Sequence, residues 1–208
     1  MSEPNNAPSL RVVLAGHSSS HPNEVAQALQ LNDAQVVQLD QPVEFPNIII
    51  NADLFILVIS AKTGVSKEMT SAWTYVSERQ VPRMVIVNGL EMSEIDFDDI
   101  VLIANRILEP VITPYLVLHD EVGEPVGLIE LTQGKVHDYS SNTLNIYEAD
   151  AELQSLVTEF KEELEESTIE LDMSAFHAGL LVPALPLVKS RLIGVAEIQE
   201  YLKEITKR

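Results

Sequence analysis

The segment from Arg11 to Leu29 constrains the fold of this chain more than any other. It reads RVVLAGHSSSHPNEVAQAL, an apolar β-branched run followed by a turn rich in glycine and serine and then by Pro22. The apolar run predicts a buried strand over 10–16. Proline suits the first turn of a helix, and we expect that helix to end at about Leu31. A strand, a tight turn and a helix in succession are typical of the first unit of a parallel α/β sheet.

Further apolar runs alternate with helix-like segments along the rest of the chain. The run at 53–60, DLFILVIS, is continuously apolar, as a strand buried on both faces would be. Trp73 lies at helical spacing from apolar neighbours and is expected in the core. This alternation predicts an α/β fold, a mostly parallel sheet with helices on both faces. The expected strands are 35–40, 53–60, 83–88, 115–119 and 180–187, and the expected helices are 66–79, 96–108 and 195–205.

The pattern changes between about 122 and 176. Apolar segments at 126–131 and 135–139 flank Thr132–Gly134, a turn that is typical of a β-hairpin. A strongly acidic segment at 149–167 follows and predicts a helix with one apolar stripe. We interpret this hairpin and helix as a small αβ insert in the larger fold.

Length and composition bound the class of protein. A chain of 208 residues with 46% hydrophobic residues can bury a sizeable core. We expect one domain at 9–208, with the insert as its subdomain, behind a flexible tail at 1–8. The chain has no cysteine, so neither a disulfide framework nor a thiolate metal site is expected. It has no signal-peptide pattern and no apolar run of about 18 residues, so we expect a cytoplasmic protein without a membrane span.

The charge of the chain bears on its partners. The formal net charge is −19, and a field of this sign repels phosphate backbones and disfavours direct nucleic-acid binding. The same charge allows a basic protein partner, ribosomal proteins included. One cluster of basic residues could still form a local basic patch. Its simplest interpretation is a set of cations near the C-terminus of a helix. That group consists of Lys189, Arg191, Lys203, Lys207 and Arg208.

Several segments carry a resemblance to a known family. The turn after Gly16 occupies the place of the phosphate-binding motif G-x-x-x-x-G-K-[ST]. The segment at 52–88, ADLFILVISAKTGVSKEMTSAWTYVSERQVPRMVIVN, and the hairpin EPVGLIELTQGKVHDYS at 124–140 extend the match. With LVPALPLVKSRLIGVAEIQEYLKEI at 181–205, the chain resembles the nucleotide-binding domain of translational GTPases, elongation factor G and its relatives. The resemblance implies a P-loop GTPase-like sheet with an insert subdomain, and GTP or GDP with magnesium as the family's ligands.

The phosphate-binding motif departs from the family pattern at its working positions. Its Gly-Lys-[ST] slots hold His21, Pro22 and Asn23. The lysine charge and the hydroxyl that binds magnesium are therefore missing. Pro22 also lacks the backbone N–H that a helix terminus would direct toward an anion.

The switch elements that the resemblance implies are altered as well. The family's D-T-P-G-H element falls on 40–44, which keeps Asp40 but places Val43 and Glu44 at the γ-phosphate glycine and the water-positioning histidine. Only residues 31–34 remain where the first switch should lie, so that switch and its threonine are expected to be deleted. Hydrolysis of GTP by the family mechanism is therefore not expected.

The base-binding elements are kept only in part. The family's N-K-x-D element reads Asn88-Gly89-Leu90-Glu91, so the asparagine remains, the lysine is lost and a glutamate ends the element. The last base-contacting pair falls on Val188 and Lys189. Asn88 has a second interpretation, in which it pins neighbouring loops and binds no base.

These departures lead to a pseudo-GTPase hypothesis: a non-catalytic domain that acts as a protein-interaction module, with no cofactor. The alternative is a weak guanine-nucleotide binding protein without efficient hydrolysis, linked to translation. A protein partner is expected, and a homodimer is left open, because deletion of the switches would expose apolar sheet edge. No catalytic residue or metal ligand is assigned. The candidate binding residues are Gly16, Ser18, Ser19, Ser20, Asn88 and Glu91.

Two local alternatives remain at the phosphate-binding turn. His17 and His21 lie four residues apart near Asp40, which resembles metal-ligand spacing, although a plain surface loop is the simpler interpretation. Asp40 could bind magnesium, or it could cap the turn that follows it, which is the simpler alternative.

Overall fold

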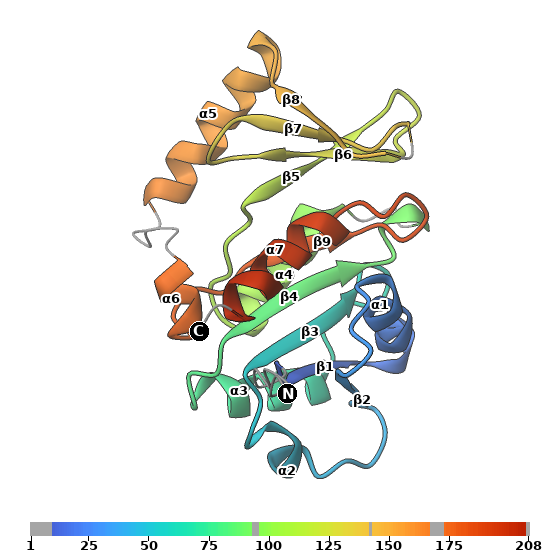
Figure 1. The fold of residues 1–208 in the computed structure, drawn as a ribbon, viewed down its shortest axis with the longest axis vertical. Coiled ribbons are helices and arrows are strands. Elements are labelled where there is room, and N and C mark those ends of the chain that lie inside the picture. The colour runs from blue at the N-terminus through green and yellow to red at the C-terminus, as the bar shows by residue number, and fades with distance from the viewer. Residues whose placement is uncertain (1–9, 93–95, 142, 167–172, 207–208) are drawn as a thin grey trace, which may run out of the picture.

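The parallel sheet forms the centre of the larger of two parts of the molecule (Figure 1). The computed structural model describes residues 10–92, 96–141, 143–166 and 173–206, so the expected tail at 1–8 lies outside the described residues. Five strands run parallel in the order β2, β1, β3, β4 and β9, which confirms the expected α/β sheet. Their bounds are Val12–Gly16 (β1), Gln35–Gln38 (β2), Leu54–Ser60 (β3), Arg83–Asn88 (β4) and Ala184–Leu187 (β9).

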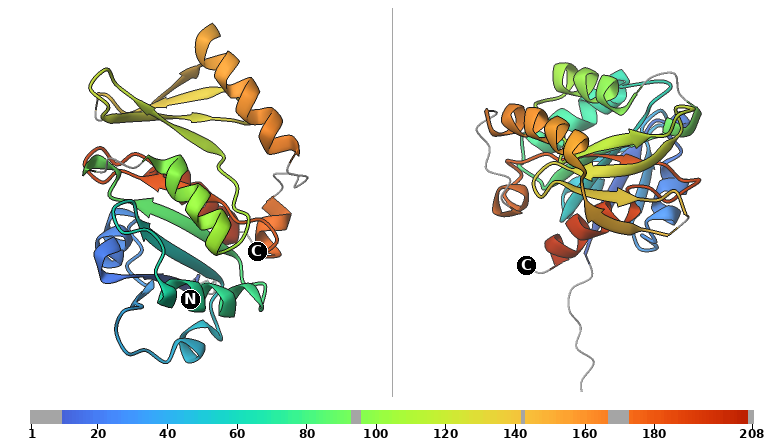
Figure 2. Two further views of the ribbon diagram at one scale, coloured as in Figure 1. Left: turned by 180° about the vertical axis from the view of Figure 1, so that it is seen from behind. Right: turned by 90° about the horizontal axis from the view of Figure 1, so that it is seen from above.

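Helices cover both faces of this sheet, α1 and α7 on one and α3 and α4 on the other (Figure 2). The chain winds from β1 outward to β2, and then from β3 outward in the opposite direction to β4 and β9. Because crossovers between parallel strands are right-handed, a reversal of direction sends the helices to opposite faces. The bounds are Pro22–Ala28 (α1), Lys67–Ser77 (α3), Phe97–Ile107 (α4) and Val195–Thr206 (α7).

The core lies between these layers. All seven residues of β3 are buried, as the continuous apolar run predicts. Trp73 of α3 is 2% exposed and lies edge-on to Phe55 of β3, which confirms its expected place in the core. Ser66 caps α3, because its hydroxyl accepts the backbone N–H of Met69 at 3.3 Å.

A second sheet stands apart from the first and runs antiparallel in the order β5, β6, β7 and β8 (Figure 1). The hairpin is confirmed, with Glu130 opposite Lys135 across its turn. Tyr115 begins this sheet, so the strand expected at 115–119 belongs here and not to the parallel sheet. The bounds are Tyr115–His119 (β5), Pro125–Glu130 (β6), Lys135–Asp138 (β7) and Asn145–Glu148 (β8).

The helix α5 (Ala151–Glu166) packs against the second sheet and closes a smaller core. Val157 of α5 is buried there with Ile129 and Val136 of the sheet, and Leu153 packs against them. The expected acidic helix is therefore present, although its last expected residue, 167, lies outside the described residues. None of the helices in the part of the chain that the structure describes is long and apolar enough to cross a membrane.

A buried polar triad joins the second sheet to α7. Glu197 of α7 is 1% exposed, and its Oε1 lies 2.6 Å from Nδ1 of His137 in β7. The hydroxyl of Tyr139, directly after β7, donates to the same carboxylate at 2.8 Å and 3.0 Å. A buried carboxylate needs such partners, so the triad fixes the second sheet to the helix that covers the first.

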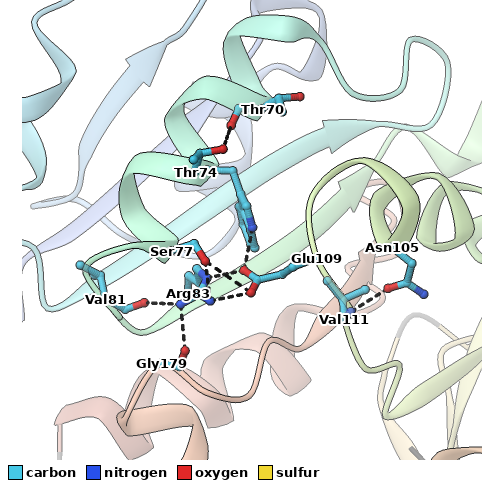
Figure 3. Close-up of polar contacts among 10 residues, drawn as sticks. Thr70, Thr74, Ser77, Val81, Arg83, Asn105, Glu109, Val111 and Gly179 are labelled. Carbon is cyan, nitrogen blue, oxygen red and sulfur yellow. Dashed lines mark hydrogen bonds and ion pairs between the residues drawn. The ribbon is translucent and has the colours of Figure 1, made fainter.

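A second polar group, here called the Arg83 cluster, stabilises the amino end of β4 (Figure 3). The guanidinium of Arg83 donates two parallel hydrogen bonds to Glu109, at 2.7 Å and 2.8 Å, and a third to the carbonyl of Gly179 at 2.9 Å. Trp73 Nε1 and the Ser77 hydroxyl complete the cluster around the same carboxylate. Arg83 is 3% exposed, so this charge is neutralised within the fold.

Some elements differ from the expected ones. The first helix ends at Ala28 and not at Leu31, since Gln30 adopts a left-handed conformation with φ 58°. The last strand covers only Ala184–Leu187, because Pro183 pairs with Ile112 as an isolated bridge. Two short helices, α2 (Phe45–Ile49) and α6 (Met173–His177), and two 3-10 turns, η1 (Ser18–Ser20) and η2 (Leu90–Met92), were not expected.

Candidate functional site

The carboxyl ends of the parallel strands meet at one edge of the sheet. Between β1 and β3 the direction of winding reverses, and doubly wound sheets bind their ligands at such a point. The turn that follows β1, residues 16–22 and here called the Gly16 loop, lies there (Figure 1). The turn that the sequence analysis compares with a phosphate-binding motif therefore lies where a doubly wound sheet would be expected to bind a ligand.

Gly16 brings this loop close to β3. A Cβ atom at Gly16 would lie 2.4 Å from the Ser20 hydroxyl oxygen and 2.7 Å from the Val58 carbonyl oxygen. Both distances are far below van der Waals contact, so a side chain at this position would push the loop away from β3. Glycine is therefore required here for packing, whether or not a ligand binds.

The backbone N–H groups of the loop are already bonded inside the protein. The N–H of Ser18 donates to Asp40 Oδ1 at 2.8 Å, and the N–H of Ser19 donates to His17 Nδ1 at 3.1 Å. The N–H of Ser20 donates to the carbonyl of His17 at 2.8 Å, and the N–H of His21 to the carbonyl of Ser18 at 3.1 Å. A phosphate at a helix N-terminus is bound by converging N–H groups, and these four point elsewhere.

The side chains of the loop bond to one another as well. His17 Nδ1 accepts from Ser19, so the neutral imidazole carries its proton on Nε2. The Ser19 hydroxyl lies 2.8 Å from the same nitrogen and 2.9 Å from the Thr63 hydroxyl in the connection between β3 and α3. The Ser20 hydroxyl donates to the His17 carbonyl at 2.8 Å. Ser18, Ser19 and Ser20 therefore hold the loop in shape.

The two altered slots at the start of α1 have their own geometry. His21 adopts a left-handed conformation, with φ 52° and ψ 52°, in the slot where the resemblance implies glycine. Such a conformation costs a non-glycine residue about 1 kcal/mol. Pro22 follows at the first helical position, and the His21 ring lies 3.3 Å from Oε1 of Glu24.

Asp40 acts on the Gly16 loop from the end of β2. The hydrogen bond from Ser18 lowers the pKa of the Asp40 carboxyl, which stays ionised beside the loop. Asp40 therefore bonds back to the loop that precedes it in the chain. Among the described residues, no group of three or more acidic or histidine side chains could hold a metal ion, so the proposed His17 and His21 metal site finds no support.

Asn88 and Glu91 have different hydrogen-bond partners. The Asn88 amide nitrogen donates to the Ser20 carbonyl at 2.9 Å, so Asn88 pins the Gly16 loop to the end of β4. Its Oδ1 is buried and has no partner within the described part of the chain. Glu91 does not reach the loop, because its Oε1 accepts the N–H of Ser190 at 3.3 Å.

An ion pair crosses the site from the connection after β9. The ammonium of Lys189 pairs with Oε2 of Glu24 in the first turn of α1, and this bond lowers the pKa of the Glu24 carboxyl. The resemblance places Lys189 in the last base-contacting pair. In the structure its ammonium is instead bound by Glu24 of the same chain. Sequence reasoning missed this pair because its partners are separated by 165 positions.

The structure thus brings Gly16, the three serines and Asn88 together, whereas Glu91 bonds to Ser190 in the connection after β9. Sequence reasoning assigned a ligand role to the serine turn. It did not find that His17, Asp40 and Thr63 hold the turn. The sequence analysis noted the spacing of His17 and His21 near Asp40 as metal-like, and that spacing gave no indication that His17 and Asp40 bond to the turn.

The fold defines the class of protein, a mixed α/β protein with a doubly wound parallel sheet and a separate antiparallel sheet. No protein-family model matches the chain. The crystal structure of ttk003000868 from Thermus thermophilus is similar, with a TM-score of 0.76 and 22% sequence identity over 94% of this chain. This chain spans 40% of the length of that one, and at this identity the likeness establishes the fold alone.

Proposed function

We propose that the chain is a non-catalytic pseudo-GTPase, related to the nucleotide-binding domain of translational GTPases, and that it acts as a protein-interaction module. The observation that carries this proposal is the bonding of the Gly16 loop. The N–H groups of residues 18–21 are all taken by acceptors inside the protein, and Pro22 has none to offer. An incoming phosphate would have to break these bonds without a lysine to compensate for them.

The charges around the loop support the same function. Asp40 places an ionised carboxylate against Ser18, where a phosphate would be repelled. Lys189, whose partner lies in the first turn of α1, is neutralised by Glu24. The electrostatic requirement of phosphoryl transfer, cations converging on developing negative charge, is therefore unmet by these residues.

The connections where nucleotide switches would lie support a constitutive module. Only residues 29–34 join α1 to β2, and the connection from β2 to β3 carries the short α2. A switch needs a segment that orders around the γ-phosphate and is released on hydrolysis. We infer that nucleotide does not switch this domain between two conformations.

The outer side of α4 supports the interaction part of the proposal. Leu102 is 65% exposed there, and Ile103 and Ile107 are 37% and 43% exposed. Leu102 lies one turn from Arg106, and Ile103 lies one turn from Ile107, so the three apolar side chains share the outer side of the helix. Apolar stripes of this kind on soluble domains commonly contact another protein.

One observation favours the second candidate function, weak guanine-nucleotide binding without efficient hydrolysis. Asn88 is 2% exposed, and its Oδ1 is a buried acceptor without a partner in the described part of the chain. A buried acceptor of this kind could receive an N–H donor, such as a purine amino group. Magnesium would then have to be held by the nucleotide and Asp40.

Calorimetry with GDP and GTP, with and without magnesium, distinguishes the two functions. We expect nucleotide-stripped protein to give no heat of binding at millimolar nucleotide. The matched comparison is the variant His21→Gly/Pro22→Lys/Asn23→Thr, which restores the three motif slots and is expected to bind more tightly than the natural chain. Micromolar binding by the natural chain would overturn the proposal and would favour the second candidate.

A further inference from the structure

A cleft of about 440 Å³ opens between the second sheet and α7. Its walls come from the start of β5, the end of β6, α6 and the last turns of α7 (Figure 1). Since α7 starts beside the carboxyl end of β9 and runs back along the sheet, this cleft lies away from the Gly16 loop. The lining residues are Tyr115, Glu130, Met173, Glu200, Tyr201, Lys203 and Glu204.

Tyr115 is the buried polar group of this cleft, here called the Tyr115 cleft. It is 6% exposed, and its ring packs edge-on against His137, with the ring centres 5.6 Å apart. Its hydroxyl makes no hydrogen bond to any residue that the structure describes. Buried tyrosines usually place their hydroxyl on a partner, so this oxygen is available to a ligand in the cleft.

Carboxylates surround the same hydroxyl. Burial, and then the charge of Glu130, raises the pKa of the Tyr115 phenol, with Glu200 contributing in the same direction. Tyr201 has its phenol pKa raised by burial and by the same two carboxylates. Both phenols therefore remain neutral and lie close to negative charge. Oε1 of Glu130 already accepts hydrogen bonds from Thr132 and Gln133. Glu200 is the more exposed of the two residues.

The lining favours a cation as the occupant. Three glutamates line the cleft, and Lys203 is the only cation among its lining residues, so the walls carry net negative charge. Anions and phosphates would be repelled from such a surface, and the overall charge of −19 attracts a basic chain toward it. The described residues form no metal-binding group of three acidic or histidine side chains, so an organic cation fits better than a metal ion.

We propose that the Tyr115 cleft binds a guanidinium group, the side chain of an arginine in a basic segment of a protein partner. A guanidinium is planar, donates hydrogen bonds in a fork that matches a carboxylate, and stacks on aromatic rings. Glu200 supplies the carboxylate, and Tyr115 supplies an acceptor oxygen at the buried end. This assignment goes beyond the pseudo-GTPase proposal and does not depend on whether nucleotide binds.

Binding of a short arginine peptide to the full chain tests the assignment. The probe is a peptide with two adjacent arginines and with both termini blocked so that they carry no charge. The readout is the chemical shift of the tyrosine ring signals in nuclear magnetic resonance spectra. We expect the signals of Tyr115 and Tyr201 to shift together on one binding curve. Tyr147 of β8 is 51% exposed and lies outside the cleft, so its signal should not move.

Matched variants separate the cleft from the general acidity of the chain. Glu200→Gln removes one carboxylate of the cleft and is expected to weaken binding about threefold, as an exposed charged pair would. Glu121→Gln removes the same charge from an exposed turn and should leave the affinity unchanged. Tyr115→Phe removes only the hydroxyl, so its peptide affinity should fall about threefold while the structure remains folded.

The outcomes decide the proposal. It is overturned if Glu121→Gln weakens binding as much as Glu200→Gln, because the attraction would then be general. Shifts spread over all tyrosines, or none, overturn it as well. A matched lysine peptide or spermidine that binds more tightly than the arginine peptide would replace the guanidinium with an ammonium or a free polyamine. Selective, arginine-preferring binding that Tyr115→Phe weakens supports the assignment.

Discussion

The Gly16 loop and the Arg83 cluster lie at opposite edges of the same sheet and use polar groups differently. In the Gly16 loop most bonds run between near neighbours, from His17 to His21, and its distant partners are Asp40, Thr63 and Asn88. In the Arg83 cluster the bonds join residues 26, 36 and 96 positions apart. The loop satisfies groups that could have served a ligand, whereas the cluster fixes separate elements of the fold to one another.

This comparison predicts different consequences for the loss of one carboxylate at each edge. A buried charge that loses its partner destabilises the whole domain, because the remaining charge has no route to water. A loop acceptor at a half-buried position leaves its donor within reach of solvent. Three predictions test the contrast, from the largest expected effect to the smallest.

Glu109→Ala should have the largest effect. The substitution leaves Arg83, which is 3% exposed, and the Trp73 N–H without their acceptor. We expect the free energy of unfolding to fall by about 3 kcal/mol, measured by urea denaturation. Glu78→Ala is the matched control, since Glu78 pairs with Arg79 at the surface, and it should cost less than about 0.5 kcal/mol. Equal losses in the two variants would contradict the contrast.

Asp40→Ala should have a smaller effect that depends on pH. The folded-state pKa of Asp40 is lowered, so its carboxylate stabilises the fold at neutral pH and loses that contribution as the pH falls through the folded value. We expect a loss below about 1 kcal/mol at pH 7 that disappears in acid once the pH falls below the folded-state pKa of Asp40. Denaturation curves from pH 7 to acid measure it.

The control for Asp40 lies in the same part of the chain. Asp33→Asn removes an exposed carboxylate in the connection before β2 and should leave the acid dependence as it is in the natural chain. A variant of Asp40 that lost the same stability at every pH would show that the carboxylate acts through packing and not through its charge.

Lys189→Ala should have the smallest effect on stability. Its partner Glu24 is largely exposed, and exposed ion pairs contribute little. We expect the midpoint of thermal unfolding to change by less than about 2 °C. Nucleotide affinity should also stay undetectable, because the N–H groups of the Gly16 loop remain bonded. A gain of GDP binding in this variant would mean that the ion pair alone closes the site.

Much of the fold could be predicted from the sequence, because long apolar runs determine buried strands. The run at 53–60 is one example, and the turn at Thr132–Gly134 between two apolar segments predicted the hairpin. The strand β8 was not expected, since Asn145–Glu148 is short and all four of its side chains are exposed. The helix α2 is likewise too short for a helical period to be recognised.

The candidate site could be predicted only as a location. The glycine and the serines marked where the loop lies, and Asn88 was found beside it. The hydrogen bonds of the loop depend on the backbone conformation of His21 and on the rotamer of His17. Neither can be predicted from the spacing of residues in the sequence. The pairing of Lys189 with Glu24 depends on the complete fold, which brings the connection after β9 to α1.

The attachment of Glu197 to the second sheet has a consequence for biosynthesis. Among the described elements, α7 leaves the ribosome after every strand of both sheets. Until α7 folds, His137 and Tyr139 have no carboxylate to bind, and one face of the parallel sheet lacks part of its cover. Domains of this size expose apolar surface while their last element is missing. The contact of Glu197 with His137 and Tyr139 therefore forms only after α7 has been synthesised, and a chain interrupted before Val195 would lack this link between the second sheet and α7.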